Sequence, residues 1–426
     1  MPRRIATLWA RAPWRDVTVR AAIGTTGANA AILGVNMLTG IITARALAPV
    51  GRGELAAMTM WPQFLAFALA FGLPTSLVFH LQRDDHPRPA VLSAALAFAA
   101  LAGLLGSVIG ALTVPLALRS YDDDAIRAAQ WFMLITPFAV MMNVLAAAFL
   151  REGSFAMYNG LRLIPPCITL VALAVLWGLG SMTPEHAAAA YLFPTIPLML
   201  VTFMAAKRSI GLVPRFDRRA AGSLIRYGLA YYGAELAGAI SSQLDRILVV
   251  WLLSPAAMGL YVVALSFSRL FQQIPLSIST AVLPKVTQLP ARDVIRLTAR
   301  AAWISAGLSA LMAAPLMLFA PFILQLFFGP QFVEAAAAFV ILSVEALIGG
   351  VAIILSQAFL GLGRPAQTSL YSAIGLVSII PLLLLLGIPY GLIGTAWATV
   401  GSSVIRVSFM LFGLRRLARQ IRAEAA

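Results

Sequence analysis

The chain has 426 residues, of which 61% are hydrophobic and only 11% are charged, and its mean hydropathy is +0.89. A soluble domain carries about 25% charged residues, so this composition excludes a soluble enzyme and indicates a polytopic membrane protein. The formal net charge of +15 could also indicate a protein that binds nucleic acid. One cysteine excludes a disulfide framework, and three scattered histidines lack metal-ligand spacing. We therefore expect no metal and no cofactor.

The N-terminal segment carries five arginines before its first apolar run, as a secretory signal peptide can. That run, Ala21–Ala44, is longer than the about 7–15 apolar residues of a signal-peptide core. We therefore expect a retained first transmembrane helix, preceded by a basic segment along the cytoplasmic membrane surface.

Apolar stretches long enough to span a bilayer, which takes about 20 mostly apolar residues in a helix, recur along the whole chain. We place twelve spans, at residues 21–44, 55–79, 90–117, 130–150, 159–180, 187–206, 225–250, 260–283, 297–325, 335–358, 367–387 and 391–414. The longest connection, Lys207–Ser223, is too short to form a catalytic domain. The predicted fold is therefore all-α, with about twelve transmembrane helices.

Lysine and arginine are distributed unevenly between alternate connections. If the N-terminus is cytoplasmic, 23 of the 31 lysine and arginine residues fall in cytoplasmic segments and four in outer segments. Positive residues are retained on the cytoplasmic side, so we expect both termini in the cytoplasm and a multi-pass protein of the cytoplasmic (inner) membrane. The excess positive charge is then a topology signal, and we expect no nucleic-acid partner.

Two motifs recur in the two halves of the chain. The stretch Leu47–Gly53 matches Leu253–Gly259 as L-x-P-x-x-x-G, and Ala148–Ala156 matches Ala358–Ala366. The offsets, 206 and 210 residues, are nearly equal, and each copy follows a corresponding span. We expect two parallel six-helix bundles, residues 1–206 and 207–426, related by an axis along the membrane normal, with spans one and seven facing each other.

Span seven carries charge at membrane depth, in Glu235, Asp245 and Arg246. At roughly 100° per residue, one helix face holds Tyr231, Glu235, Gly238, Ser242 and Arg246. Charges within a membrane usually face a bundle interior or a water-filled cavity, so this stripe predicts a cavity wall. The alternative is an ordinary packed helix in which Asp245 and Arg246 pair near the lipid headgroups.

Other polar side chains lie in spans that could face the same cavity. The candidates are Asn29 and Asn36 in span one, Arg52 after it, Arg269, Gln272 and Gln273 in span eight, and Glu345 in span ten. For asparagine and glutamine, interhelical hydrogen bonding explains the residues equally well. Intramembrane charge is harder to explain that way, so Arg269 and Glu345 favour a functional role.

Motifs for enzymatic chemistry are missing or better explained otherwise. The sequence contains no G-x-x-x-x-G-K-[ST] phosphate-binding loop. The run Asp122-Asp123-Asp124 could hold a divalent cation, as in a glycosyltransferase, but it lies in a short predicted outer loop. We interpret it as a solvated acidic turn and expect no enzyme.

Several of these segments together resemble a known family. They are Arg45 followed by L-A-P-V-G-R-G, the L-D-R at 244–246, the M-G-L-Y at 258–261 and the repeated A-F-L-x-x-G. The chain resembles a polysaccharide-biosynthesis protein of the O-antigen flippase branch of the multidrug/oligosaccharidyl-lipid/polysaccharide (MOP) exporter superfamily. The resemblance implies a V-shaped pair of six-helix bundles that moves a lipid-linked oligosaccharide by alternating access. Related lipid II flippases have more spans than the twelve predicted here, so we do not favour that assignment.

We therefore expect a flippase for a polyprenyl-(pyro)phosphate-linked glycan, accompanied by glycosyltransferases or a polymerase of the same pathway. Arginine forms bidentate contacts with phosphate, so the candidates for the phosphate linkage are Arg52, Arg246 and Arg269. The acidic residues that could balance charge, bind sugar hydroxyls or carry a coupling proton are Glu235, Asp245 and Glu345.

Two other functions fit parts of the sequence. A cation-coupled multidrug exporter of the same fold commonly has a carboxylate in its first span, and Ala21–Ala44 has none. A polytopic glycosyltransferase or polymerase would need an outer catalytic loop, and no predicted connection is long enough.

Overall fold

The computed structural model describes residues 17–83, 87–151, 155–210, 217–229 and 249–423, and these residues form helices and no strand. The first half comprises α2 (Val17–Ala68), α3 (Leu73–Arg83), α4 (Arg88–Ala117), α5 (Asp123–Phe132), α6 (Thr136–Arg151), α7 (Phe155–Gly178), α8 (Pro184–Leu192) and α9 (Thr195–Ile210). The second half comprises α11 (Pro255–Ser268), α12 (Gln273–Val286), α13 (Ala291–Leu318), α14 (Ala320–Phe328), α15 (Ala336–Gly361), α16 (Pro365–Leu382) and α17 (Ile388–Ala423).

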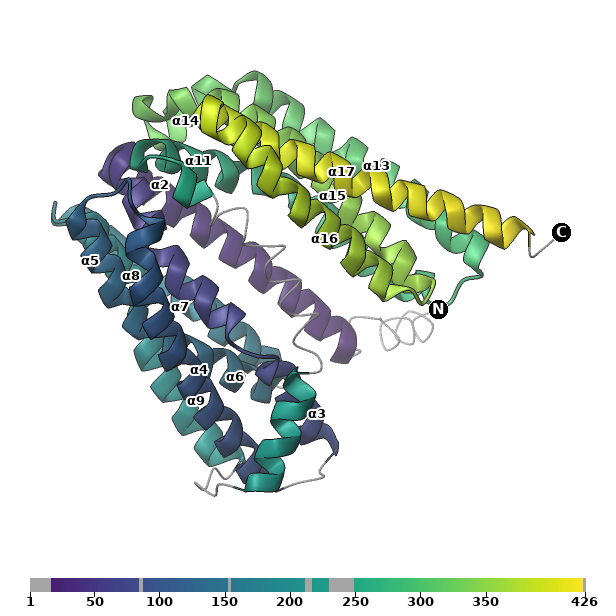
Figure 1. The fold of residues 1–426 in the computed structure, drawn as a ribbon, viewed down its shortest axis with the longest axis horizontal. Helices are drawn as coiled ribbons and strands as arrows, with labels where there is room; N and C mark the ends of the chain where they lie inside the picture. Colours follow the sequence, from purple (N-terminus) through teal and green to yellow (C-terminus); the bar gives the residue numbers. More distant parts are fainter. Residues whose placement is uncertain (1–16, 84–86, 152–154, 211–216, 230–248, 424–426) are drawn as a thin grey trace, which may run out of the picture.

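The helices form two arms that diverge from a common apex (Figure 1). One arm contains α4, α6 and α9, and the other contains α13, α15 and α17. The apex contains the bend of α2 together with α11, α5 and α8, and the first half of α2 runs between the arms. The molecule is thus V-shaped, as the family resemblance implied.

Eight helical stretches of the described residues are long and apolar enough to cross a membrane. Two of them, Gly27–Ala68 with 42 residues and Pro365–Ile421 with 57, are each long enough for two crossings at about 20 residues per crossing. Each of these two is bent at one residue with positive φ, Ala48 or Gly391. Most of span seven lies outside the described residues, so the number twelve remains a prediction.

Several spans predicted as single helices are interrupted near a proline. Span two is divided between α2 and α3, span four between α5 and α6, span six between α8 and α9, span eight between α11 and α12, and span nine between α13 and α14. Proline lacks an N–H and clashes with the preceding turn, but fits the first turn of a helix. Pro74, Pro137 and Pro275 each lie within the first three residues of the helix that follows the break. The breaks therefore restart helices at positions that proline tolerates.

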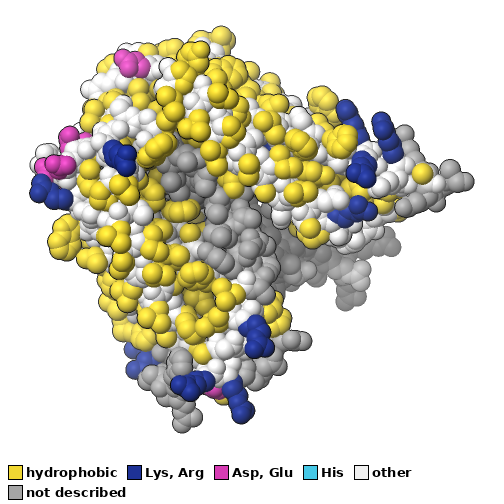
Figure 2. Space-filling view, viewed as in Figure 1, with side chains coloured by type: hydrophobic (Ala, Val, Ile, Leu, Met, Phe, Trp, Pro, Cys, Tyr) yellow, Lys and Arg dark blue, Asp and Glu magenta, His cyan; other side chains and the backbone are white. Residues whose placement is uncertain are grey.

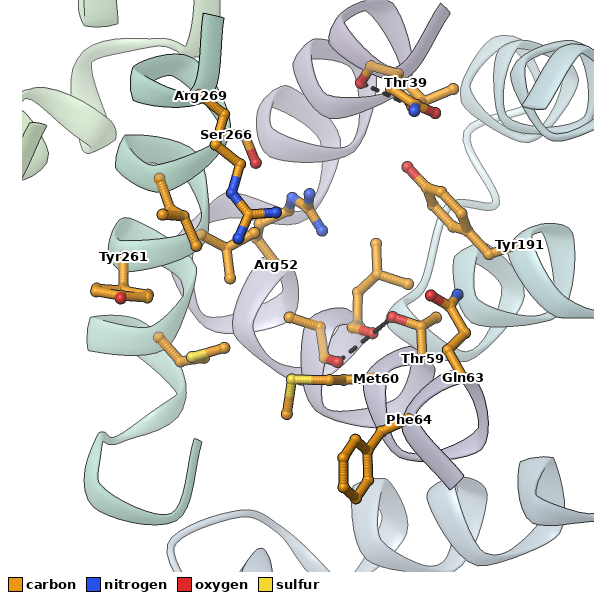
Figure 3. A pocket seen from close by; sticks show the side chains of 16 residues that line it. Thr39, Arg52, Thr59, Met60, Gln63, Phe64, Tyr191, Tyr261, Ser266 and Arg269 are labelled. Carbon is orange, nitrogen blue, oxygen red and sulfur yellow. Dashed lines mark hydrogen bonds between the residues drawn. The ribbon is translucent and has the colours of Figure 1, made fainter. Parts of the chain in front are cut away.

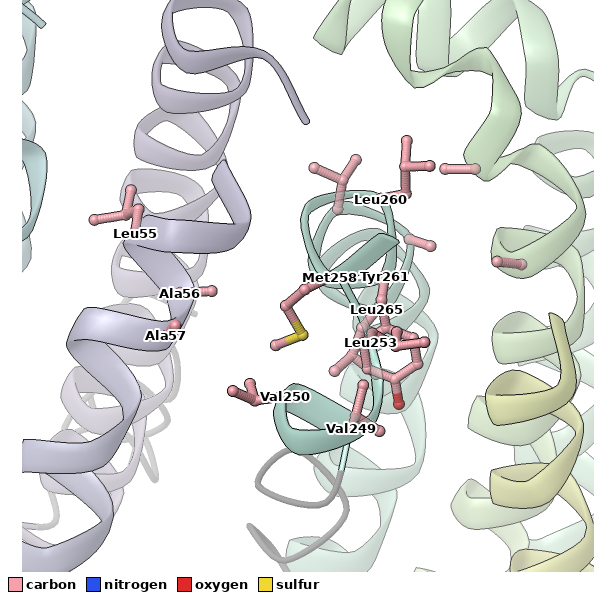
Figure 4. Close-up of a cluster of buried hydrophobic side chains, with 14 of the residues drawn as sticks. Leu55, Ala56, Ala57, Val249, Val250, Leu253, Met258, Leu260, Tyr261 and Leu265 are labelled. Atoms are coloured by element: carbon pink, nitrogen blue, oxygen red, sulfur yellow. The ribbon is translucent and has the colours of Figure 1, made fainter. Parts of the chain in front are cut away.

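Three separate hydrophobic cores explain the V shape. The largest contains residues of both halves at the apex, where Ala56 of α2 lies opposite Met258 of α11 (Figure 4). A second core lies within the first arm and a third within the second arm, and neither includes residues of the other arm. The bundles are thus joined by packing at the apex, whereas each arm is stabilised by its own interior.

Helical residues 218–229 pack with the first arm, although they follow the predicted bundle boundary at 206. Ala220 and Leu224 belong to the same core as Leu77 of α3, and the ring of Tyr227 stacks on Phe79 at 4.0 Å between centroids. The hydroxyl of Ser76 donates to the carbonyl oxygen of Leu224 at 2.8 Å. The packing boundary of the first bundle therefore extends to this segment, and the 206/207 division of the whole chain stays a prediction.

The two L-x-P-x-x-x-G motifs contact each other reciprocally at the apex. A Cβ atom on Gly53 would overlap the carbonyl oxygen of Pro255, and a Cβ on Gly259 would overlap the carbonyl oxygen of Pro49. Each imagined Cβ would also lie 3.1 Å from the backbone nitrogen of the other glycine. Only glycine allows this backbone approach, and its symmetry is what a two-fold relationship between parallel repeats produces.

Charged side chains are segregated along the V (Figure 2). In the face shown, lysine and arginine gather at the free ends of both arms, whereas the acidic side chains gather mainly at the apex. The positive-inside rule predicts such a distribution when the open side of the V faces the cytoplasm, and this orientation stays a prediction.

Candidate functional site: an arginine-lined cavity at the apex

A cavity of about 290 Å³ lies where the second half of α2, α8 and α11 approach one another, on the inner side of the apex (Figure 3). Its lining residues are Asn36, Thr39, Arg52, Leu55, Ala56, Thr59, Met60, Gln63, Phe64, Tyr191, Met258, Tyr261, Val262, Leu265, Ser266 and Arg269. Both bundles contribute to this set, so the cavity lies at their interface.

Two arginines from different bundles point into this central cavity (Figure 3). Arg52 follows the bend of α2 and is only 9% exposed, and its Nε has no hydrogen-bond partner among the described residues. Arg269 ends α11 and is half-buried. The described residues of the lining include no aspartate or glutamate. A buried charge is costly unless it is paired, so this arrangement of described residues suits an anion that supplies acceptors to the guanidinium groups.

The first bundle supplies uncharged polar groups to the opposite wall. The hydroxyl of Thr39 donates to the carbonyl oxygen of Asn36 at 3.0 Å, and that of Thr59 donates to Leu55 at 2.8 Å. These hydroxyls have used their protons within α2 and present oxygen lone pairs. The side chains of Gln63 and Tyr191 reach the same space and can both donate and accept. The cavity therefore combines a cationic side with a hydrogen-bonding side.

A short 3₁₀ turn, Arg269–Gln272, separates the neighbouring polar residues of span eight. A 3₁₀ helix has about three residues per turn, compared with 3.6 in an α-helix. Arg269 lines the central cavity, whereas Gln272 faces α15, where a Cβ on Gly349 would lie 3.5 Å from its Nε2. Gln273 is half-buried and lines neither this cavity nor the next. The polar cluster predicted for this span is thus divided, and only Arg269 of its three residues lines the central cavity.

A second, smaller cavity of about 90 Å³ lies inside the second bundle, behind α11. Glu345 of α15 and Arg406 of α17 both line it, and the hydroxyl of Ser403 donates to Oε1 of Glu345 at 2.8 Å. The Nε of Arg406 is buried without a hydrogen-bond partner among the described residues. Tyr261 borders both cavities, so one helix separates the two sites. This second site holds opposite charges, whereas the described lining of the central cavity holds only positive ones.

The sequence-predicted residues are therefore only partly brought together. Asn36, Arg52 and Arg269 line the central cavity, and Glu345 lines the second one. Asn29 is exposed two turns before Asn36 on α2 and lines neither cavity. Glu235, Asp245 and Arg246, with the polar stripe that contains them, lie outside the described residues.

Most lining residues of these sites were not among the predicted ones, including Gln63, Tyr191 and Arg406. Arg406 carried a signal, because a charge within a predicted span is unusual. Tyr191 carried none, since an aromatic residue in an apolar span is ordinary. Among the residues that the structure describes, no three His, Cys, Asp or Glu side chains are grouped as a metal site requires.

Comparison with known proteins gives one family and one fold. A family described as "Polysaccharide biosynthesis protein" matches residues 42–337. No curated protein matches the chain.

Three solved structures illustrate the shared fold. "Lipid II flippase MurJ, inward closed conformation" has a TM-score of 0.78 at 16% identity, covering 93% of this chain and 87% of that one. An inward-facing multidrug resistance MATE family transporter of the MOP superfamily has a TM-score of 0.75 at 18% identity, covering 92% and 96%. A MOP superfamily transporter from Pyrococcus furiosus, described as having a binding pocket of reversed polarity, has a TM-score of 0.60 at 18% identity, covering 95% and 96%. At these identities the likeness establishes the fold, which is all-α and shared with MOP transporters as predicted.

Proposed function

Because the chain belongs to the polysaccharide biosynthesis protein family and has the fold of MOP transporters, we propose that it flips a polyprenyl-(pyro)phosphate-linked oligosaccharide across the cytoplasmic membrane. The observation that carries the proposal is the central cavity, in which Arg52 and Arg269 face each other and no other described lining residue is charged. The substrate class follows from this chemistry, because it joins an anionic phosphate linkage to a polar sugar and an apolar lipid.

The two sides of the cavity match the two polar parts of such a substrate. Arginine presents a planar fork of donors that binds phosphate oxygens in pairs, so Arg52 and Arg269 would hold the phosphate linkage. Sugar hydroxyls both donate and accept hydrogen bonds, as Gln63 and Tyr191 do. A cavity of about 290 Å³ is too small for a long glycan, so the rest of the glycan would lie between the arms.

The distribution of packing supports transport by alternating access. The apex is closed by a core shared between the bundles, whereas the arms have separate cores and diverge. With the basic ends of the arms in the cytoplasm, this form would load substrate from the cytoplasmic side. Release on the other side requires the apex packing to open while the arms approach each other.

The pathway around such a flippase defines its partners. Cytoplasmic glycosyltransferases would assemble the glycan on its lipid, and a polymerase or transferase on the outer side would consume it. Transport itself requires no bond to be made or broken in the substrate, so we propose that the protein works without a cofactor and is no enzyme.

A cation-coupled multidrug exporter of the same fold is the second candidate, because a MATE transporter is among the similar structures. A cationic drug would favour acidic side chains in the cavity, whereas the lining residues that the structure describes include two arginines and no acidic residue. Charge in the cavity therefore favours an anionic substrate.

Reconstitution into liposomes tests the proposal directly. The probe is a fluorescent disaccharide linked through diphosphate to a polyprenyl chain, and its exposure on each leaflet is followed with a membrane-impermeant quencher. We expect faster movement of this probe than in empty liposomes, and no transport of ethidium. Ethidium transport without movement of the lipid-linked probe would establish the exporter instead.

A further inference from the structure

A groove of about 300 Å³, separate from both cavities, lies on the first bundle, and all of its lining residues in the described part of the chain are apolar. Leu73 of α3 and Ala102 of α4 are buried in its floor, whereas Leu101, Leu105 and Leu229 are exposed at its rim. The groove is therefore open on one side. The same exposed side of α4 continues with Leu112, which is 71% exposed, as expected of a helix face turned toward lipid.

The break between α2 and α3 shapes the end of this groove. Phe71 and Gly72 both adopt positive φ, 49° and 68°, and the chain changes direction there. A Cβ on Gly72 would lie 2.6 Å from the carbonyl oxygen of Gly228, so segment 218–229 approaches the break backbone to backbone. This approach brings Leu229 beside Phe71 in the groove.

The groove is close to the arginine-lined cavity along the chain. Phe64 lines the cavity and Phe71 lines the groove, and the two residues are seven positions apart. Phe64 lies four residues before α2 ends at Ala68, about 6 Å along the helix axis, and Phe71 lies in the turn that follows. Leu73 also belongs to the core of the arm, whereas Phe64 packs against the apex core. The groove therefore begins where the apex ends.

We propose that this groove holds the first isoprene units of the substrate lipid while its phosphate is bound at Arg52 and Arg269. The inference rests on the proposed function, since it needs a phosphate attached directly to a prenyl chain. A chain leaving a phosphate in the cavity must reach lipid within a few isoprene units, and the groove offers an apolar path at that distance.

Shape, and not apolarity alone, must select this occupant over bulk lipid. Lipid chains are as apolar as leucine, so entering the groove gives no net hydrophobic gain within a bilayer. Selectivity then comes from the many weak contacts that a methyl-branched chain makes with a matching wall. We therefore expect a modest preference for the prenyl chain, about fivefold over a short-chain analogue.

Photocrosslinking in nanodiscs identifies the occupant. One probe is a long-chain polyprenyl phosphate with a diazirine in the isoprene units next to the phosphate, and the control probe is a phospholipid with a diazirine in an acyl chain. We expect the prenyl probe to label peptides containing Leu101, Leu105 or Leu229, and unlabelled polyprenyl phosphate to compete. Equal labelling by the phospholipid probe, without competition, would show an ordinary lipid-facing surface and overturn the inference.

A pair of matched variants tests the role of the groove in binding. Leu105→Trp fills the groove from its rim, and Leu112→Trp adds the same side chain on the same helix face outside it. We expect Leu105→Trp to bring the affinity for long-chain polyprenyl phosphate down about fivefold, to that of a ten-carbon prenyl phosphate, with Leu112→Trp unchanged. Both positions are exposed, so folding should be retained.

The outcomes also separate this inference from the proposed function. If the wild-type protein bound long-chain polyprenyl phosphate and the ten-carbon prenyl phosphate equally tightly, the inference about the groove would be wrong and the proposed flippase function would stand. Wild-type protein that binds neither phosphate would overturn both.

Discussion

The Nε of Arg45 donates a hydrogen bond to the carbonyl oxygen of Phe327 over 2.9 Å, and a second guanidinium nitrogen donates to Leu326. Arg45 lies before the bend of α2, and its partners are the last residues of α14. The last carbonyl groups of a helix lack intrahelical partners and carry partial negative charge, so a cation there is stabilising. This contact connects the two bundles at the apex, the part that must open for release to the outer side.

We predict that Arg45→Ala shifts the protein toward an apex-open form. Losing charge-assisted hydrogen bonds at an exposed site costs about 1 kcal/mol, or about fivefold in the ratio of the two forms. Ser266→Cys, which lines the central cavity, would report this shift as faster reaction with an impermeant thiol reagent added outside, in a chain with Cys167→Ser. Arg127→Ala is the matched control, because Arg127 pairs with Asp124 within one helix. Unchanged labelling in Arg45→Ala would exclude this contact from the outer gate.

The reciprocal glycine contacts predict matched effects in the two halves. Gly53→Ala and Gly259→Ala should each lower the free energy of unfolding by about 3 kcal/mol, because a methyl group would displace a backbone carbonyl. Gly40→Ala in α2 is the control, since nothing lies within 4 Å of its Cβ position, and it should be neutral or slightly stabilising. Thermal unfolding in detergent measures all three. If Gly53→Ala or Gly259→Ala were as stable as wild type, the close backbone contact at that glycine would not contribute to the free energy of unfolding.

Transport should depend on the charge and the shape of Arg269. Arg269→Lys keeps the charge but loses the planar fork, and Arg269→Ala loses both. We expect both variants to reach the membrane at near-normal levels while transport of the lipid-linked probe falls, about tenfold for alanine and less for lysine. Arg296→Ala, at the exposed end of the second arm, should transport normally. Loss of Arg269→Ala protein from the membrane, instead of loss of transport, would indicate a structural ion pair.

The second cavity predicts coupling between its two charged residues. Arg406→Met should destabilise the protein, because Glu345 would lose the positive charge in its cavity. The double variant Arg406→Met/Glu345→Gln should recover part of that loss, with a coupling energy of about 1–3 kcal/mol. A double-mutant cycle of unfolding free energies measures it. Strict additivity would show that the two charges do not interact.

The topology prediction uses two serines in connections predicted on opposite sides. In a chain with Cys167→Ser, a cysteine at Ser181 should react with an impermeant thiol reagent in intact cells, and one at Ser209 should not. The reason is that arginine and lysine concentrate in the connection that contains Ser209. The opposite labelling pattern would reverse the orientation.

The sequence by itself determined the class of fold, and it predicted an internal repeat. Helices in a bilayer need long apolar stretches, and this requirement acts on each stretch locally, so hydropathy alone indicates the spans. The motifs Leu47–Gly53 and Leu253–Gly259 indicated two related halves, and they meet at the apex through Gly53 and Gly259. Intramembrane charge drew attention to Arg269 and Glu345, because charge at that depth is costly wherever it occurs.

Only the tertiary structure decided which polar groups share a site. Arg52 and Arg269 are far apart in sequence and meet because two bundles pack at the apex. Gln272 is only three residues from Arg269, yet it faces Gly349 of α15 and lines neither cavity. The acceptors of Arg45 are backbone carbonyls, which no side-chain pattern identifies. Contacts of this kind depend on the relative orientation of packed helices, whereas hydropathy along the chain determines only which segments become helices in the membrane.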